Sequence, residues 1–509
     1  MFTLISQAFP QVLTLQNLIV INVGMLIGII FGAIPGLNGN LAITVLLPFT
    51  FSMDTIPAIL MLTAIFFGSN FGGSISAILI NTPGTGNAAA TVLDGYPLAQ
   101  KGYPNKSLMT ALTASTFGGI FSALCLLFLS QPISDVARKM SYPEYFALAV
   151  FGLSIIAFIS GKSMAKGLIC GGIGVLLSTV GIDKTSGLNR FTFGKLQLYS
   201  GLTMMAVLLG TFAISQMIDR VVKQQQNEGS CMKESLNDDK LTLTEAKGLI
   251  PTMLKSSLIG SVIGAIPGTG GNIAAFISYN EARRKAKPDE HFGEGALRGI
   301  AAPESANNGA TCCVLIPLLT LGIPGDIVAA TLLSALTMHG LIVGPQLFAT
   351  SGVTVYAILI GCVIAQVFIY LQGKYLLGLF VKATNAPYDL LTAALVAICC
   401  TGAYSINGKI MDVYVMCAAG IISYVLKKFD FPIVPLVLGM VLGSTAESNL
   451  RSTVTVINGS WLNFFKRPVC LGLTIILILL IVTTIRGNRS AAAKTSPSTI
   501  ESDKPNEKI

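Results

Sequence analysis

Residues 32–40 read GAIPGLNGN, and residues 264–272 read GAIPGTGGN. The two nonapeptides agree at seven of nine positions, at a constant offset of 232 residues. Each one ends a long apolar run with Pro-Gly and then offers several backbone amides and an asparagine side chain. Lipid supplies no hydrogen-bond partner, so irregular backbone at membrane depth survives only where protein or a water-filled cavity covers it. The doubled motif therefore predicts two broken membrane helices that form a site.

Paired breaks at corresponding places in two internal repeats are typical of secondary transporters, where they bind substrate and coupling ions near the bilayer midplane. The alternative is a pair of Gly-Pro kinks that merely let helices pack closely. We favour a site, because paired interruptions are the best sequence indication of one.

The composition indicates a membrane protein. Of 509 residues, 52% are hydrophobic and only 11% are charged, against about 25% in ordinary soluble proteins. The first charged side chain is Asp54 and the next is Asp94, and a spanning helix needs about 20 largely apolar residues. The net charge of +9 comes from basic residues between apolar runs and in the tail, as expected for cytoplasmic loops, so nucleic-acid binding is the weaker interpretation.

Several other classes of protein are disfavoured by missing motifs. The N-terminus lacks the basic region and cleavage site of a secretory signal, so the first apolar run is expected to stay in the mature protein. The ten cysteines lie mostly in apolar runs without CxxC spacing, and the two histidines, His291 and His339, lie in no HExxH pattern. The sequence also contains no GxxxxGK[ST] phosphate loop, so nothing in it supports ATP-driven transport.

Further similarities extend the duplication. A second break, NTPGTGN at residues 81–87, corresponds to LGIPGDIVAAT at residues 321–331, and the segments that begin at Pro143 and Pro387 are also alike. The sequence predicts an all-α polytopic membrane protein with two inverted internal repeats, broken or re-entrant helices and about 10–12 spans. The predicted parts are a first membrane repeat (1–219), a polar cytoplasmic linker (220–248), a second membrane repeat (249–460), a final transmembrane helix (461–486) and a disordered polar tail (487–509).

The orientation follows from charge. A charge-free N-terminus, a basic linker and a basic tail fit an N-terminus outside, inverted halves and a C-terminus inside. The basic pair Lys466-Arg467, just before the final span, argues the other way.

These blocks resemble the large membrane subunit of the tripartite tricarboxylate transporters, the TctA family. The resemblance covers roughly residues 15–460 and rests on long blocks. They are GAIPGLNGN, NTPGTGNAAATVLDGYPLAQKG, GAIPGTGGN, APESANNGA and LGIPGDIVAATLLSALTMHGL.

The resemblance implies a multi-pass subunit of the bacterial inner membrane and no enzyme. It implies two partners, a small four-helix membrane subunit and a periplasmic solute-binding protein that delivers carboxylates such as citrate. Uptake would be driven by a gradient of Na⁺ or H⁺, with no cofactor. The alternatives are a stand-alone carboxylate/ion symporter and an anion channel, both without a binding protein.

The breaks then acquire expected roles. Helix N-terminal amides and neutral side chains favour an anionic substrate, and many modest hydrogen bonds would let the anion leave again. The expected substrate-binding residues are Gly36, Asn38, Asn40, Thr82, Gly84, Thr85, Asn87, Gly268, Thr269, Gly271, Asn272 and Gly325. The candidates for binding the coupling ion are Glu304, Asn308 and Asp326, because a membrane-embedded acid is by default functional; for Asp326, helix capping is an equal alternative. Asp94 is expected to face an aqueous phase.

An intramembrane enzyme is disfavoured. The sequence has no GxSxG elbow, and in LGIPGD an isoleucine, Ile323, stands where a GxGD motif needs glycine. We expect no catalytic residue and no protein-bound metal site.

Overall fold

The structure is a computed structural model that describes residues 2–159, 164–183, 186–224, 240–267, 270–288, 290–383 and 388–479. Some predictions fall outside these ranges. They concern Gly268, Thr269, residues 225–239 of the linker, the end of the final helix and the tail 487–509.

The apolar composition produces helices, because a helix satisfies its own backbone groups in lipid. Among the described residues, six helices are long and apolar enough to cross a membrane. They are α2 (Leu15–Ala33), α4 (Thr55–Ile80), α6 (Pro104–Ala137), α17 (Gly352–Tyr375), α20 (Ile410–Lys428) and α21 (Ile433–Val456). The prediction of an all-α polytopic membrane protein is confirmed.

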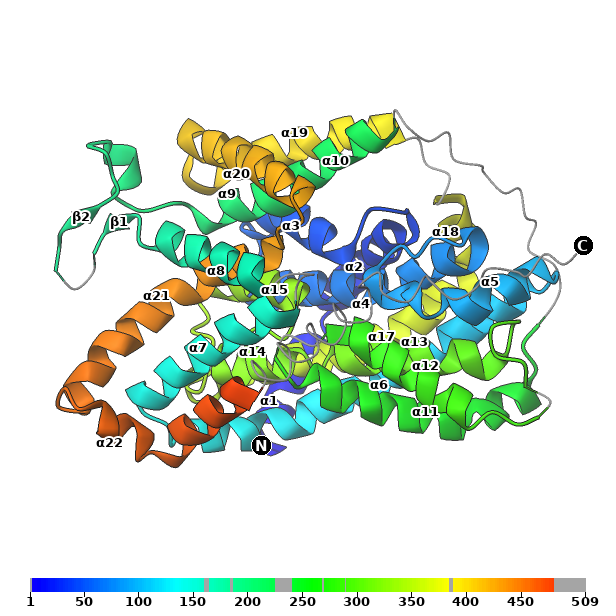
Figure 1. Cartoon of the computed structure of the whole chain (residues 1–509). Coiled ribbons are helices and arrows are strands. Elements are labelled where there is room, and N and C mark those ends of the chain that lie inside the picture. Colours follow the sequence, from blue (N-terminus) through cyan, green and yellow to red (C-terminus); the bar gives the residue numbers. More distant parts are fainter. Residues whose placement is uncertain are drawn as a thin grey trace, which may run out of the picture.

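Shorter elements complete the described chain (Figure 1). The shorter apolar helices include α3 (Gly39–Thr50), α8 (Met164–Ser178), α15 (Ile327–Met338) and Pro468–Leu479. The predicted number of spans stays a prediction. The other elements are α1 (Phe2–Val12), η1 (Gly86–Ala89), α5 (Val92–Gln100), α7 (Tyr142–Ile159), β1 (Gly181–Ile182), β2 (Asn189–Arg190), η2 (Leu196–Leu198), α9 (Met204–Leu208), the π-helical η3 (Leu209–Ile214), α10 (Ser215–Gln224), α11 (Leu243–Gly264), α12 (Gly270–Arg284), α13 (Leu297–Thr311), α14 (Leu315–Leu321), α16 (Leu347–Thr350), α18 (Leu377–Ala383), α19 (Tyr388–Asn407) and α22 (Trp461–Phe465).

Two helix crossings, one in each half, correspond to each other. A Cβ on Gly28 of α2 would lie 2.3 Å from the Ile65 carbonyl oxygen of α4, and one on Gly260 of α11 would lie 2.1 Å from the Ala306 carbonyl oxygen of α13. Gly28 and Gly260 are 232 residues apart, the offset of the doubled nonapeptide. Glycine is needed at both places because the helix backbones approach too closely for a side chain.

The outer helices exchange partners between the halves. The α7–α8 hairpin of the first half packs against α21 of the second, and the α19–α20 hairpin of the second half packs against α9, η3 and α10 of the first. Figure 1 shows α9, α10, α19 and α20 together at one side and α7, α8, α21 and α22 at another. Close glycine contacts hold both groups, as at Gly174, where a Cβ would lie 1.9 Å from the Leu436 carbonyl oxygen, and at Gly210, where it would lie 2.2 Å from the Met416 carbonyl oxygen.

One prediction about a loop is wrong. Asp94, expected to face water, is fully buried. Its carboxylate accepts hydrogen bonds from the Tyr279 hydroxyl (2.9 Å) and from the backbone amides of Gly293 (2.8 Å), Gly295 (2.9 Å) and Ala296 (2.8 Å). Because four donors replace its hydration, the carboxylate can be buried and can fasten the loop before α13 to α5.

Candidate functional site

A cavity of about 730 Å³ lies where the helix breaks meet. Its wall draws residues from the starts of α3, α12 and α15, from the loop after α4, and from α4, α10, α20 and α21. Several residues that the sequence singled out therefore lie around one space. They are Asn38, Asn40, Gly84, Thr85, Asn87, Gly271, Asn272 and Asp326.

The first break separates α2 from α3. Gly36 adopts a left-handed φ of 76°, which favours glycine, and the Gln216 side-chain amide of α10 donates to its carbonyl oxygen. Asn38 then caps α3 by accepting a hydrogen bond from the Leu41 amide (2.8 Å). The chain thus leaves one helix and starts the next within five residues, and it places Asn40 on the cavity wall.

The second break differs from the expected one. α4 ends at Asn81 in a left-handed conformation (φ 54°), and the Gly84 amide donates back to the Gly73 carbonyl oxygen (3.1 Å). The expected helix directly after Pro83-Gly84 is a single 3₁₀ turn, η1, and α5 begins only at Val92. A Cβ on Gly84 would lie 2.0 Å from the Gly32 carbonyl oxygen, so close packing fixes this loop against α2.

The other two breaks lie in the second half. α12 begins at Gly270, which has a left-handed φ of 64°, and its next residues, Gly271 and Asn272, line the cavity. α14 ends at Gly322 (φ 74°), and Asp326 caps α15 by accepting from the Ala329 amide (2.7 Å). The starts of α3, α12 and α15 therefore converge on the same cavity.

Neutral amides dominate the polar part of the wall. The lining side chains that carry an amide are Asn38, Asn40, Asn70, Asn87, Gln216 and Asn272, and the charged ones are Asp219, Asp326 and Lys427. Asn40 is held in place because the Thr331 hydroxyl donates to its Oδ1 (2.6 Å). The Lys427 ammonium donates to the Ser215 hydroxyl (2.9 Å). The arrangement offers many weak donors and acceptors to a polar ligand.

Some expected substrate-binding residues do not line this cavity. Thr82 is exposed, and its hydroxyl donates to the Ile80 carbonyl oxygen (3.2 Å). Gly325 is buried against Val314, and Gly36 contributes through the hydrogen bond of its carbonyl oxygen to Gln216. Gly268 and Thr269 lie outside the described residues.

Other wall residues were missed by the sequence interpretation. Ser69 and Asn70 lie in the GSNFGGS stretch of α4, whose small residues favour close helix packing. Gln216 and Lys427 come from α10 and α20, far from any break. The signal available for Asn70 was that it is the one amide side chain in an otherwise largely apolar helix.

The candidates for binding the coupling ion occupy three different environments. Asp326 lines the cavity. Glu304 of α13 is fully buried outside it, and its carboxylate accepts from the hydroxyls of Ser74 (2.6 Å), Ser115 (2.7 Å) and Thr91. The amide of Asn308 donates to the Glu304 carbonyl oxygen (3.1 Å). The described residues contain no group of three or more His, Cys, Asp or Glu side chains that could hold a metal ion.

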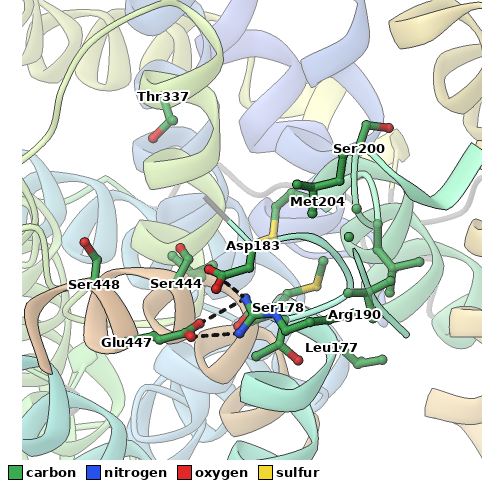
Figure 2. A pocket seen from close by; sticks show the side chains of 18 of the residues that line it. Leu177, Ser178, Asp183, Arg190, Ser200, Met204, Thr337, Ser444, Glu447 and Ser448 are labelled. Atoms are coloured by element: carbon green, nitrogen blue, oxygen red, sulfur yellow. Dashed lines mark hydrogen bonds and ion pairs between the residues drawn. The ribbon is translucent and has the colours of Figure 1, made fainter. Parts of the chain in front are cut away.

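A second pocket of about 470 Å³ contains a charged network that the sequence had not indicated. Figure 2 shows Arg190 of β2 reaching Glu447 of α21, through two hydrogen bonds of 2.8 and 3.3 Å. Arg451 bonds both Glu447 (2.6 Å) and Asp183 (3.2 Å). The hydrogen bond from Glu447 raises the pKa of Arg190. Since these charges satisfy one another, the network ties the β1–β2 loop to α21.

Comparisons with known proteins identify the class. The chain belongs to the tripartite tricarboxylate transporter TctA family, whose pattern matches residues 18–438, and the predicted resemblance is confirmed. It is 34% identical over 489 residues to an "Uncharacterized 52.8 kDa protein in TAR-I ttuC' 3'region" of Agrobacterium vitis, covering 95% of this chain and 97% of that protein. It is 36% identical over 234 residues to an "Uncharacterized protein in TAR-II ttuC' 3'region" of Agrobacterium vitis, covering 45% of this chain and 97% of that protein. No solved structure matches.

Family and fold together define a multi-pass membrane protein that is a component of a tricarboxylate transporter. A transporter family and a membrane-helical fold imply that the protein is not an enzyme. The tripartite family also implies partner subunits.

Proposed function

We propose that this chain is the translocating large subunit of a bacterial inner-membrane importer for citrate-like tricarboxylates or related carboxylates. A periplasmic solute-binding protein would deliver the substrate, a small four-helix membrane subunit would complete the complex, and a Na⁺ or H⁺ gradient would drive uptake. The observation that carries the proposal is the cavity that residues of the helix breaks line.

Two helix N-termini support an anionic substrate. α3 and α12 have 12 and 15 residues, and the first residues of each line the cavity. The first amides of a helix have no partner within the helix, and the helix dipole places partial positive charge there. A substrate carboxylate at these two ends gains hydrogen bonds and favourable electrostatics, whereas the start of α15 is already capped by the Asp326 carboxylate.

Neutral donors suit turnover. A substrate held by side-chain amides makes hydrogen bonds worth about 0.5–1.5 kcal/mol each, whereas a buried ion pair would leave an uncompensated charge when the substrate departs. Several amides from both halves can therefore select a polyanion and still release it. Lys427, on α20, adds one positive charge to a wall that also contains Asp219 and Asp326.

The experiment is uptake of labelled citrate into proteoliposomes that contain this chain and its small subunit. Na⁺ and H⁺ gradients are imposed separately, with and without the binding protein. We expect saturable uptake that needs one of the gradients and the binding protein.

The other outcomes are equally informative. Gradient-driven uptake that is unchanged without the binding protein would support a stand-alone symporter. A citrate conductance that does not saturate would support an anion channel. If no carboxylate of a citrate, tartrate and succinate panel is taken up, although the binding protein binds at least one of them, the proposal is wrong.

A further inference from the structure

A polar cluster extends from the cavity wall to α13. It contains Asn70 of α4, Asn87 of η1, and Asn307 and Thr311 of α13. The Asn87 amide donates to Asn70 Oδ1 (3.2 Å), and the Asn70 amide donates to the Thr311 hydroxyl (2.8 Å). The Thr311 hydroxyl in turn donates to the Asn307 carbonyl oxygen (2.9 Å). One connected group of neutral oxygens thus joins both halves.

Asn307 is the unusual member. Its side chain is 0% exposed, and neither its Oδ1 nor its Nδ2 has a hydrogen-bond partner among the described residues. A buried polar group without a partner destabilises the folded state, and a native structure retains such a group for a reason. The orphaned amide therefore indicates a missing ligand.

The amide points toward the cavity. A Cβ on Gly271 would lie 2.7 Å from Asn307 Oδ1 and 3.1 Å from Asn87 Nδ2. Gly271, Asn70 and Asn87 all line the cavity as well. A ligand at Asn307 would therefore be separated from the substrate only by the first turn of α12.

The donor set selects the kind of ligand. Uncharged amide and hydroxyl oxygens suit a hard cation, whereas soft metals prefer thiolate or imidazole ligands. Mg²⁺ and Ca²⁺ usually bind through carboxylates, and the four cluster residues include none. A proton would need a titratable group, which these four residues also lack. A small monovalent cation fits the set best.

We propose that Asn70, Asn87, Thr311 and Asn307 bind Na⁺, with Asn307 Oδ1 as the ligand that is otherwise unsatisfied. A cation at this position would place its charge beside the carboxylate cavity, where the low dielectric makes attraction strong. Cation and anion would then favour each other's binding by the same factor. This coupling depends on the proposed function, but the cation site does not.

The test uses the purified full-length protein in detergent and follows thermal unfolding as NaCl replaces choline chloride at constant ionic strength. A ligand that binds only the folded state raises the unfolding midpoint in a concentration-dependent way. We expect a saturating rise with Na⁺ and a smaller one with K⁺. In Asn307→Ala, the Na⁺ concentration that gives half of the maximal rise in the unfolding midpoint should increase at least about ten-fold. The reason is the loss of a ligand worth about 1.4 kcal/mol.

Asn17→Ala is the matched control. Asn17 of α2 is also buried, but its amide donates to the Gln11 carbonyl oxygen (2.6 Å) and it does not line the cavity, so this variant should lose stability and keep the Na⁺ response. Asn87→Ala, on η1, provides a second test if Asn307→Ala does not fold. The site is wrong if the unfolding midpoint does not change as Na⁺ replaces choline. It is also wrong if Asn307→Ala, or Asn87→Ala where Asn307→Ala does not fold, keeps the full Na⁺ response.

Transport separates the two proposals. Na⁺ binding to the purified protein, together with uptake driven by H⁺ alone, would retain the cation site and remove Na⁺ coupling. Na⁺-driven uptake in a protein whose stability ignores Na⁺ would retain the transporter and reject this site.

Discussion

Gly36 shows how one backbone conformation creates the site. Its left-handed φ lets the chain turn between α2 and α3 and brings its carbonyl oxygen to Gln216. The left-handed region costs other residues roughly 1–2 kcal/mol, and more for a β-branched one. We therefore expect Gly36→Val to abolish uptake while membrane insertion, checked by fractionation, stays intact.

Gly102→Val is the control for Gly36→Val. Gly102 has a φ of 91°, and a Cβ there would have no neighbour within 4 Å. It should show the same backbone strain and retain uptake. Wild-type uptake in Gly36→Val would mean that this break does not shape the transport site.

Asn40 tests the wall chemistry. It lines the cavity, and Thr331 orients its amide. Removing one neutral hydrogen bond of about 0.5–1.5 kcal/mol should raise the KM for uptake in Asn40→Ala by roughly 2- to 12-fold. Thr82→Ala, at an exposed position outside the wall, should leave the KM unchanged. Equal KM values in the wild type, Asn40→Ala and Thr82→Ala would exclude Asn40 from substrate binding.

The sequence predicted some of the residues that line the cavity but not others, and the position of each residue explains why. Asn38 and Asn40 could be predicted because they follow a Pro-Gly interruption in an otherwise apolar run. Asn70, Gln216 and Lys427 could not, because they lie within continuous helices and reach the cavity only through helix packing.

At the scale of elements, Glu304 links four segments. Its carboxylate accepts from Ser74 on α4, Thr91 just before α5, and Ser115 on α6, while the residue itself belongs to α13. Replacing Glu304 with alanine leaves a void and leaves the buried hydroxyls without a partner. Each unpaired hydroxyl lowers the stability of the folded state by about 1–3 kcal/mol. We expect Glu304→Ala to lower the thermal unfolding midpoint by several degrees in detergent.

Two further variants make the result for Glu304 specific. Glu304→Gln retains an oxygen that accepts hydrogen bonds, so it should lose less stability than the alanine variant. Glu294→Ala removes an exposed acid and should leave the midpoint unchanged. If Glu304→Ala unfolds at the wild-type temperature, the carboxylate does not hold these helices together.

The helix breaks were also predicted unevenly. The turn at Gly36 could be predicted because glycine accepts a left-handed conformation. The second-half break was expected at Pro324-Gly325, whereas α14 already ends at Gly322. The 3₁₀ turn after Gly84 was not foreseen, since GNAAATV reads locally as a good helix and only packing of Gly84 against α2 and Gly73 sets its shape.

At the scale of the whole molecule, composition and the doubled motif predicted the helical class and the duplication. They could not predict which helices contact one another across the halves. The packing of α7 and α8 against α21 depends on glycines such as Gly174 and Gly439, and glycine is so common in membrane helices that it does not indicate a partner.

This exchange of hairpins has a consequence for biosynthesis. The ribosome completes α7 and α8 long before it begins α21, which starts at Ile433. Contacts between segments that lie far apart in the sequence also form slowly. Until then the backbone groove at Gly174 faces lipid without its partner. The first half of the chain therefore cannot reach its final form during its own translation. Truncated or stalled chains would carry an uncovered helix surface by which membrane quality control can distinguish them from finished ones.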